Sequence, residues 1–128
     1  MRRYLAFFAL SLVAAPAAAQ DWRQAREYEV IVSSYDIAPS QIRLDAKRPV
    51  RLRLINQSGQ SHILRAPGFF GAARVRRRDQ DAVANGRVTV GPGETRELLL
   101  VPAPGRYTLR SGNFLYRMLG MSGEIVVE

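Results

Sequence analysis

Short runs in which apolar and polar residues alternate recur along the chain from residue 28 onward. The first three are Tyr28–Ser34, Gln41–Asp45 and Val50–Ile55. An alternation of this kind places successive side chains on opposite faces, and the β-branched residues in these runs favour strands. In the third run we expect Leu52 and Leu54 in the core and Arg53 in solvent, as in a sheet with one wet face.

Further runs of the same kind continue toward the C-terminus, separated by turn residues. They are Ser61–Arg65, Arg87–Val90, Glu94–Val101, Tyr107–Arg110 and Gly123–Val127. Residues 69–86 lack a strand period; we expect a short helix at Phe69–Arg74 and a tight turn at Asn85-Gly86. Seven or eight short strands at this spacing predict an all-β fold, an antiparallel Greek-key β-sandwich, with Leu98 and Leu100 facing its core.

The first nineteen residues have the pattern of a secretory signal peptide. They begin with two arginines, continue with an apolar stretch, Tyr4–Ala14, and end in alanines suited to cleavage before Gln20. The apolar stretch is shorter than the roughly 20 residues that a membrane-spanning helix needs. We therefore expect a signal peptide over residues 1–19, one domain over residues 20–128, and a periplasmic or secreted product that is not transmembrane. An uncleaved anchor is the alternative.

The composition excludes several kinds of chemistry. The chain has no cysteine and a single histidine, His62. Disulfides, thiolate metal ligands and cysteine nucleophiles are therefore excluded. A serine nucleophile would need a base beside it, and His62 has no G-x-S-x-G context. The sequence predicts that the protein is not an enzyme.

The chain is strongly basic, which favours anionic partners. Its formal net charge is +8, and the two signal-peptide arginines account for two of these charges, leaving +6. The densest cluster consists of Arg74, Arg76, Arg77 and Arg78. Arginine binds carboxylates and phosphates in a bidentate manner, so this Arg-rich loop is predicted to dock an acidic protein surface or anionic lipid rather than nucleic acid. The alternative is a solvated loop, neutralised in part by Asp79 and Asp81.

Several motifs occur in an order that resembles the small periplasmic cupredoxins, the blue-copper fold. A strand is followed by Pro39, a second strand, a V-x-L-x-L strand that ends near Asn56, and then His62 before an apolar residue. Downstream come the segment GPGETRELLLVPAPGRYTL, then Met121, and a closing G-x-I-x-V strand. The likeness covers almost the whole mature chain. It implies a cupredoxin-like sandwich in which His62 would be the N-terminal copper ligand and Met121 the weak axial one.

Two copper-ligand positions implied by the resemblance hold other residues. Ser111 stands where the family has its copper thiolate, and Tyr116 stands near its C-terminal histidine. A serine hydroxyl stays protonated near neutral pH, and a phenol has an ordinary pKa of about 10. Since a blue-copper site needs two imidazoles and a thiolate, the copper site is degenerate. We expect Ser111, Asn113 and Tyr116 to fill the ligand pocket with hydrogen bonds.

These features favour a metal-free binding or accessory module, monomeric and without a cofactor. It would recognise a partner through the Arg-rich loop and the segment Phe114–Met121. The alternative is a periplasmic copper-binding carrier in which His62, Met118 and Met121 hold Cu(I), because thioethers suit this ion. A copper electron-transfer protein is the least favoured reading, since these side chains cannot build a redox metal site.

Overall fold

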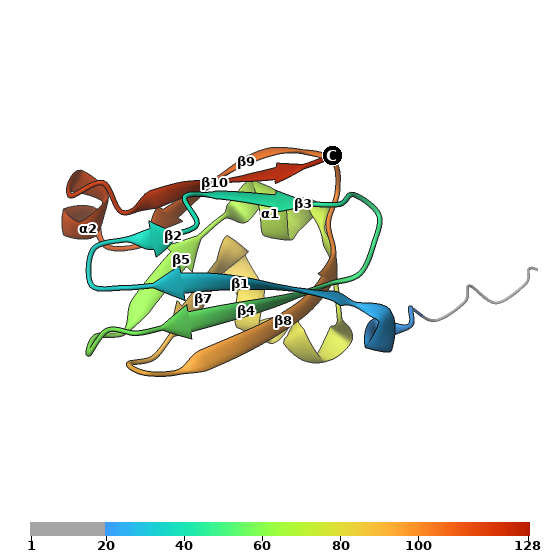
Figure 1. The fold of residues 1–128 in the computed structure, drawn as a ribbon, viewed down its shortest axis with the longest axis horizontal. Coiled ribbons are helices and arrows are strands. Elements are labelled where there is room, and N and C mark those ends of the chain that lie inside the picture. Colours follow the sequence, from blue (N-terminus) through green and yellow to red (C-terminus); the bar gives the residue numbers. More distant parts are fainter. Residues whose placement is uncertain (1–19) are drawn as a thin grey trace, which may run out of the picture.

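The protein folds into two β-sheets that pack face to face (Figure 1), as seen in a computed structural model that describes residues 20–128. The predicted signal peptide lies outside the described residues. The first sheet has the order β2-β1-β4-β8-β6 and the second β3-β10-β9-β5-β7. The first sheet contains β1 (Arg26–Val32), β2 (Ile37–Ala38), β4 (Val50–Asn56), β6 (Arg74–Val75) and β8 (Thr95–Val101). The second contains β3 (Gln41–Leu44), β5 (His62–Arg65), β7 (Arg87–Val90), β9 (Gly105–Ser111) and β10 (Ser122–Val127).

Short helices fill the connections. They are the 3₁₀ helices η1 (Trp22–Gln24), η2 (Arg77–Asp79) and η3 (Asp81–Gly86), and the α-helices α1 (Pro67–Ala72) and α2 (Phe114–Met118). The helix expected at Phe69–Arg74 is α1, which begins two residues earlier because Pro67 suits the first turn of a helix. At the expected Asn85-Gly86 turn both residues have positive φ, and a Cβ on Gly86 would lie 2.5 Å from the Pro67 Cα.

The predicted β-sandwich is confirmed, but its strand pairing is mixed rather than wholly antiparallel. β1 runs parallel to β4, and β3 runs parallel to β10. Parallel neighbours need a crossover, and the chain provides the first one by passing through β2 and β3 between β1 and β4. Within residues 20–128 there are ten strands instead of seven or eight. The additional strands β2 and β6 have two residues each, too few to show an alternation.

The core lies between the inner faces of the two sheets. Leu98 and Leu100 are fully buried there, as predicted. Leu99 points to the opposite face and is also buried, because the segment that contains η2 covers the outer side of β8. In the part of the chain described, no helix has the length and hydropathy needed to span a bilayer.

Candidate functional site

Three of the predicted site residues meet at one end of the second sheet. His62 begins β5, which pairs with β9 so that Leu64 lies opposite Ser111. The Ser111 backbone N–H donates to the carbonyl oxygen of Met121 at 3.2 Å. His62, Ser111 and Met121 are all buried, with at most 1% of each residue exposed. The strand register therefore places the imidazole, the hydroxyl and the thioether on elements that lie side by side.

The His62 imidazole has one satisfied nitrogen and one bare nitrogen. Its Nε2 lies 3.0 Å from the Ser58 hydroxyl oxygen. The Ser58 hydroxyl is 2.7 Å from Asn56 Oδ1 and 3.0 Å from the Gln60 carbonyl oxygen, both acceptors. Its single proton therefore goes to one of them, so Nε2 donates to Ser58 and the neutral ring leaves a lone pair on Nδ1. His62 Nδ1 is buried without a hydrogen-bond partner.

Burial also sets the charge of His62. Removal from water lowers the pKa of His62 below its ordinary value of 6.5, because the protonated ring loses its hydration. The imidazole is therefore neutral near pH 7, in agreement with a buried Nδ1 that has no acceptor for a second proton.

Asn56 fixes the loop that carries Ser58. Its side-chain amide nitrogen lies 2.7 Å from the Gln60 carbonyl oxygen and 3.0 and 2.9 Å from those of Val90 and Gly91. Its Oδ1 accepts the Ser58 backbone N–H at 2.9 Å. The asparagine at the end of the V-x-L-x-L strand thus ties the 57–61 loop to the turn after β7. Ser58 was not among the predicted site residues, although a hydroxyl four residues before the single histidine was a signal for it.

Tyr116 of α2 closes the site from outside. Its ring centroid lies 5.2 Å from that of His62 and 5.9 Å from that of Tyr35, and its hydroxyl donates to Gln60 Oε1. Beside the His62 ring remains a pocket of about 180 Å³, lined by Ser61, His62, Ile63, Gly112, Asn113 and Tyr116. The ring of Tyr116 thus occupies space next to the imidazole, and its hydroxyl is held by the same loop that holds Ser58.

The turn between β9 and α2 is internally hydrogen-bonded. The Ser111 hydroxyl oxygen accepts the backbone N–H of Asn113 at 3.2 Å. Asn113 in turn caps α2, since its Oδ1 accepts the Leu115 N–H at 2.9 Å. The Ser111 hydroxyl, which stands where the resemblance implies a copper thiolate, therefore accepts a backbone hydrogen bond within the turn.

These donors do not fit a blue-copper centre. The sequence supplies no thiolate and one imidazole, and the hydroxyls of Ser111 and Tyr116 are engaged in hydrogen bonds. Across residues 20–128, His, Asp and Glu side chains form no cluster of three or more that could hold a metal ion. Met118, the third residue of the predicted Cu(I) site, is 70% exposed on α2, whereas Met121 is fully buried. The structure therefore does not bring Met118 to His62 and Met121.

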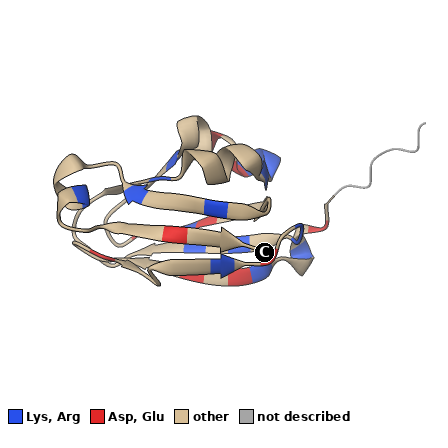
Figure 2. Ribbon diagram, turned by 90° about the horizontal axis from the view of Figure 1, so that it is seen from above, with Lys and Arg blue, Asp and Glu red and all other residues tan. Residues whose placement is uncertain are grey.

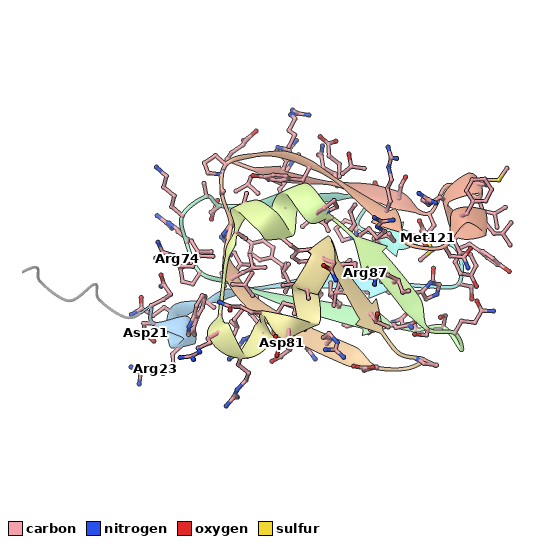
Figure 3. The ribbon with its side chains drawn as sticks, turned by 180° about the vertical axis from the view of Figure 1, so that it is seen from behind. Asp21, Arg23, Arg74, Asp81, Arg87 and Met121 are labelled. Carbon is pink, nitrogen blue, oxygen red and sulfur yellow. The ribbon has the colours of Figure 1, made fainter. Side chains whose placement is uncertain are left out.

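The Arg-rich loop lies at the other end of the sandwich. Figure 3 shows Arg74 near the start of the described chain and Met121 at the opposite end. Arg76 forms a bidentate pair with Asp79, at 3.0 and 3.2 Å. Asp79 is buried and also accepts the Leu99 N–H at 3.0 Å. Arg76 is therefore structural, whereas Arg74, Arg77 and Arg78 remain exposed.

Solved structures with the same architecture were found, although no protein-family model and no curated protein matches the sequence. Reduced auracyanin from Roseiflexus castenholzii has 15% identity and a TM-score of 0.59, over 81% of this chain and 98% of that one. Auracyanin B has 20% identity and a TM-score of 0.57, over 82% and 90%. A multicopper oxidase from Campylobacter jejuni has 14% identity and a TM-score of 0.61, over 89% of this chain and 32% of the oxidase. At these identities the likeness concerns the fold, and this chain has a cupredoxin-like fold.

Proposed function

We propose that this protein is an exported, non-enzymatic binding module that works without a resident metal. The observation that carries the proposal is the arrangement around His62. The Ser58 hydroxyl oxygen accepts a hydrogen bond from the Nε2–H group, and the Tyr116 ring packs against the imidazole. The Tyr116 hydroxyl also donates to Gln60, so the hydrogen bonds of this region connect the 57–61 loop with α2.

The recognition surface that we propose is an apolar patch beside this site. Phe114, Leu115, Met118 and Leu119 are each between 63% and 70% exposed. Single exposed apolar residues are common, but a group of large ones on one short segment is typical of an interaction site. We call these four residues the α2 patch. The exposed Arg74, Arg77 and Arg78 form a second, separate candidate contact, for an acidic protein surface.

One observation favours a second candidate function, a Cu(I) carrier. The bare Nδ1 of His62 is a buried lone pair without a partner, and the buried thioether of Met121 belongs to the same end of the sheet. One imidazole nitrogen and one thioether sulfur suit Cu(I). Met118 could join them only if α2 left the position described above.

A Cu(I) titration of the mature protein against a competing chelator tests the two functions. The metal-free module predicts no stoichiometric binding, and the same result for His62→Ala. Stoichiometric binding that is lost in His62→Ala would overturn this and establish the carrier. In that case Met121→Leu should weaken binding at least tenfold, about 1.4 kcal/mol. Met118→Leu, at an exposed position, is the matched control and should leave the affinity unchanged.

A further inference from the structure

Three arginines lie opposite one another on the outer face of the second sheet. Arg87 of β7 pairs in register with Arg65 of β5, and Arg65 pairs in register with Arg110 of β9. All three are exposed. Like charges directly opposite each other destabilise a sheet. We call these three residues the arginine row.

The arginine row has no acidic partner within the described chain. In residues 20–128 the ion pairs within 4.0 Å involve six other arginines, namely Arg23, Arg26, Arg53, Arg76, Arg96 and Arg106. The row therefore combines mutual repulsion with a lack of internal compensation. A negatively charged ligand would relieve both.

A pocket of about 300 Å³ joins this row to α2. It is lined by Arg65, Pro67, Thr108, Arg110 and Arg117. Three arginines and a threonine thus border one pocket, and the third arginine comes from the helix. A planar guanidinium fork matches the oxygens of a phosphate, so the pocket has the chemistry of a phosphate site.

The α2 patch lies next to these charges. Arg117 belongs to α2, and its guanidinium carbon is 5.7 Å from the centre of the Phe114 ring. From the end of β9 through α2 the ribbon carries blue segments and no red one (Figure 2). A free phosphate ion would engage the pocket but leave the four apolar side chains in water. A phospholipid bilayer offers phosphates and, directly beneath them, an apolar layer.

We propose that the arginine row, Arg117 and the α2 patch bind the surface of an anionic phospholipid bilayer. Lipid phosphates contact Arg65, Arg110 and Arg117, and the apolar side chains of α2 enter the interface. This inference rests on the proposed function in taking the α2 patch as the recognition surface. It does not depend on the absence of a metal.

Co-sedimentation of the mature protein with lipid vesicles tests the proposal. One set of vesicles consists of phosphatidylcholine alone, and in the other a third of the lipid is phosphatidylglycerol. We expect binding to the anionic vesicles, weakened by salt. A basic residue near an anionic surface changes the partition coefficient about fivefold. The triple variant Arg65→Gln, Arg110→Gln, Arg117→Gln should therefore lower it on the order of 100-fold.

Two control variants separate the site from general charge. The triple variant Arg74→Gln, Arg77→Gln, Arg78→Gln removes the same charge from the opposite end, and we expect less than a threefold loss. An equal loss in both variants would overturn the assignment of the site in favour of net charge. Leu115→Ser with Met118→Ser should also weaken binding at least tenfold, and unchanged binding would overturn the role of the α2 patch. All substituted side chains are exposed, so the variants should fold, which circular dichroism checks.

The remaining outcomes distinguish other ligands. Inorganic phosphate could protect the three pocket arginines from chemical modification while the protein fails to bind vesicles. That result would identify the ligand as a free oxyanion and not a bilayer. Binding to polyglutamate but not to anionic vesicles would indicate an acidic protein partner instead. Either result overturns the lipid inference and leaves the metal-free module standing, because that proposal is decided separately by the Cu(I) titration.

Discussion

On the outer faces of the two sheets, a central arginine has neighbours of opposite charge. In the first sheet Arg53 of β4 lies in register between Glu29 of β1 and Glu97 of β8, at 3.0 and 3.5 Å from their carboxylates. In the second sheet Arg65 lies in register between two further arginines, Arg87 and Arg110. The first face is neutralised by the chain itself. The second is neutralised at Arg106, which pairs with Glu124 of β10, but not at the arginine row, and this difference marks the row as the part of the face that an external anion would stabilise.

The first sheet continues the same pattern at its edge. Arg76 and Asp79 compensate each other behind β8, although they belong to the loop with the highest density of arginines. A dense charge run in the sequence can therefore be partly structural. By contrast, the arginines without an acidic partner, Arg65, Arg87 and Arg110, are far apart along the chain.

The largest loss of stability is expected for the most buried ion pair, Arg76–Asp79. Arg76→Ala leaves the buried carboxylate of Asp79 without its cation, and we expect the free energy of unfolding to fall by about 2 kcal/mol. Arg77→Ala, which removes an exposed neighbour, should change it by no more than about 0.5 kcal/mol. Chemical denaturation measures both. Equal effects would show that the Arg76–Asp79 pair adds no stability beyond that of the surrounding loop.

The next effect concerns the inner face of the second sheet. Because burial lowers the pKa of His62 below 6.5, the folded state binds this proton more weakly than the unfolded state does. Stability should be constant above about pH 7 and fall as the pH drops below 6.5, by up to about 1.4 kcal/mol per pH unit. His62 is the single histidine of the chain, so His62→Gln should abolish the slope between about pH 6.5 and pH 5. A slope that persists in the variant would contradict this origin.

A smaller effect tests the neutralised face directly. Arg53→Gln removes a cation that lies within 4.0 Å of three carboxylates, those of Glu27, Glu29 and Glu97. We expect a loss of about 1 kcal/mol, limited by solvent screening because the Arg53 side chain is 32% exposed. Thermal denaturation at low and at high salt would measure this loss of stability. An increase in stability would show that the Glu29–Arg53–Glu97 register contributes nothing favourable.

The smallest effect has the opposite sign. Arg65→Gln relieves repulsion from Arg87 and Arg110, so it should raise the free energy of unfolding by about 0.5 kcal/mol at low salt. High salt should reduce the gain, because exposed charges are screened. Arg53→Gln is the matched comparison, because there the same substitution is expected to lower the free energy of unfolding. A destabilised Arg65→Gln would mean that the arginine row is compensated within the chain.

Much of the fold could be predicted because strand positions depend on local alternation. Arg87–Val90 was predicted with the bounds that β7 has, and Leu98 and Leu100 were expected in the core where they lie. The parallel pairs could not be predicted in this way, since they depend on which sheet each strand joins. The two-residue strands carry no periodic signal.

The site was predictable where it follows motifs, and not where it depends on register. His62, Ser111 and Met121 were expected to be neighbours because of their order in the resemblance, and they lie at one end of one sheet. Met118 was grouped with His62 and Met121 because its thioether suits Cu(I), but on α2 it is 70% exposed. The helix itself had a local signal, an asparagine cap at Asn113. The arginine row had none, because its members become neighbours only when β5, β7 and β9 pair.

The pairing of β10 has a consequence for the order in which the protein can be made. This last strand of the domain lies between β3 and β9, so the second sheet joins residues 122–127 to residues 41–44. The connection is among the most non-local in the chain, and such contacts form late in folding. Until residues 122–127 have left the ribosome, β3 has no neighbour in its sheet. The second sheet therefore cannot be completed before residues 122–127 are synthesised, whereas all strands of the first sheet lie within residues 26–101.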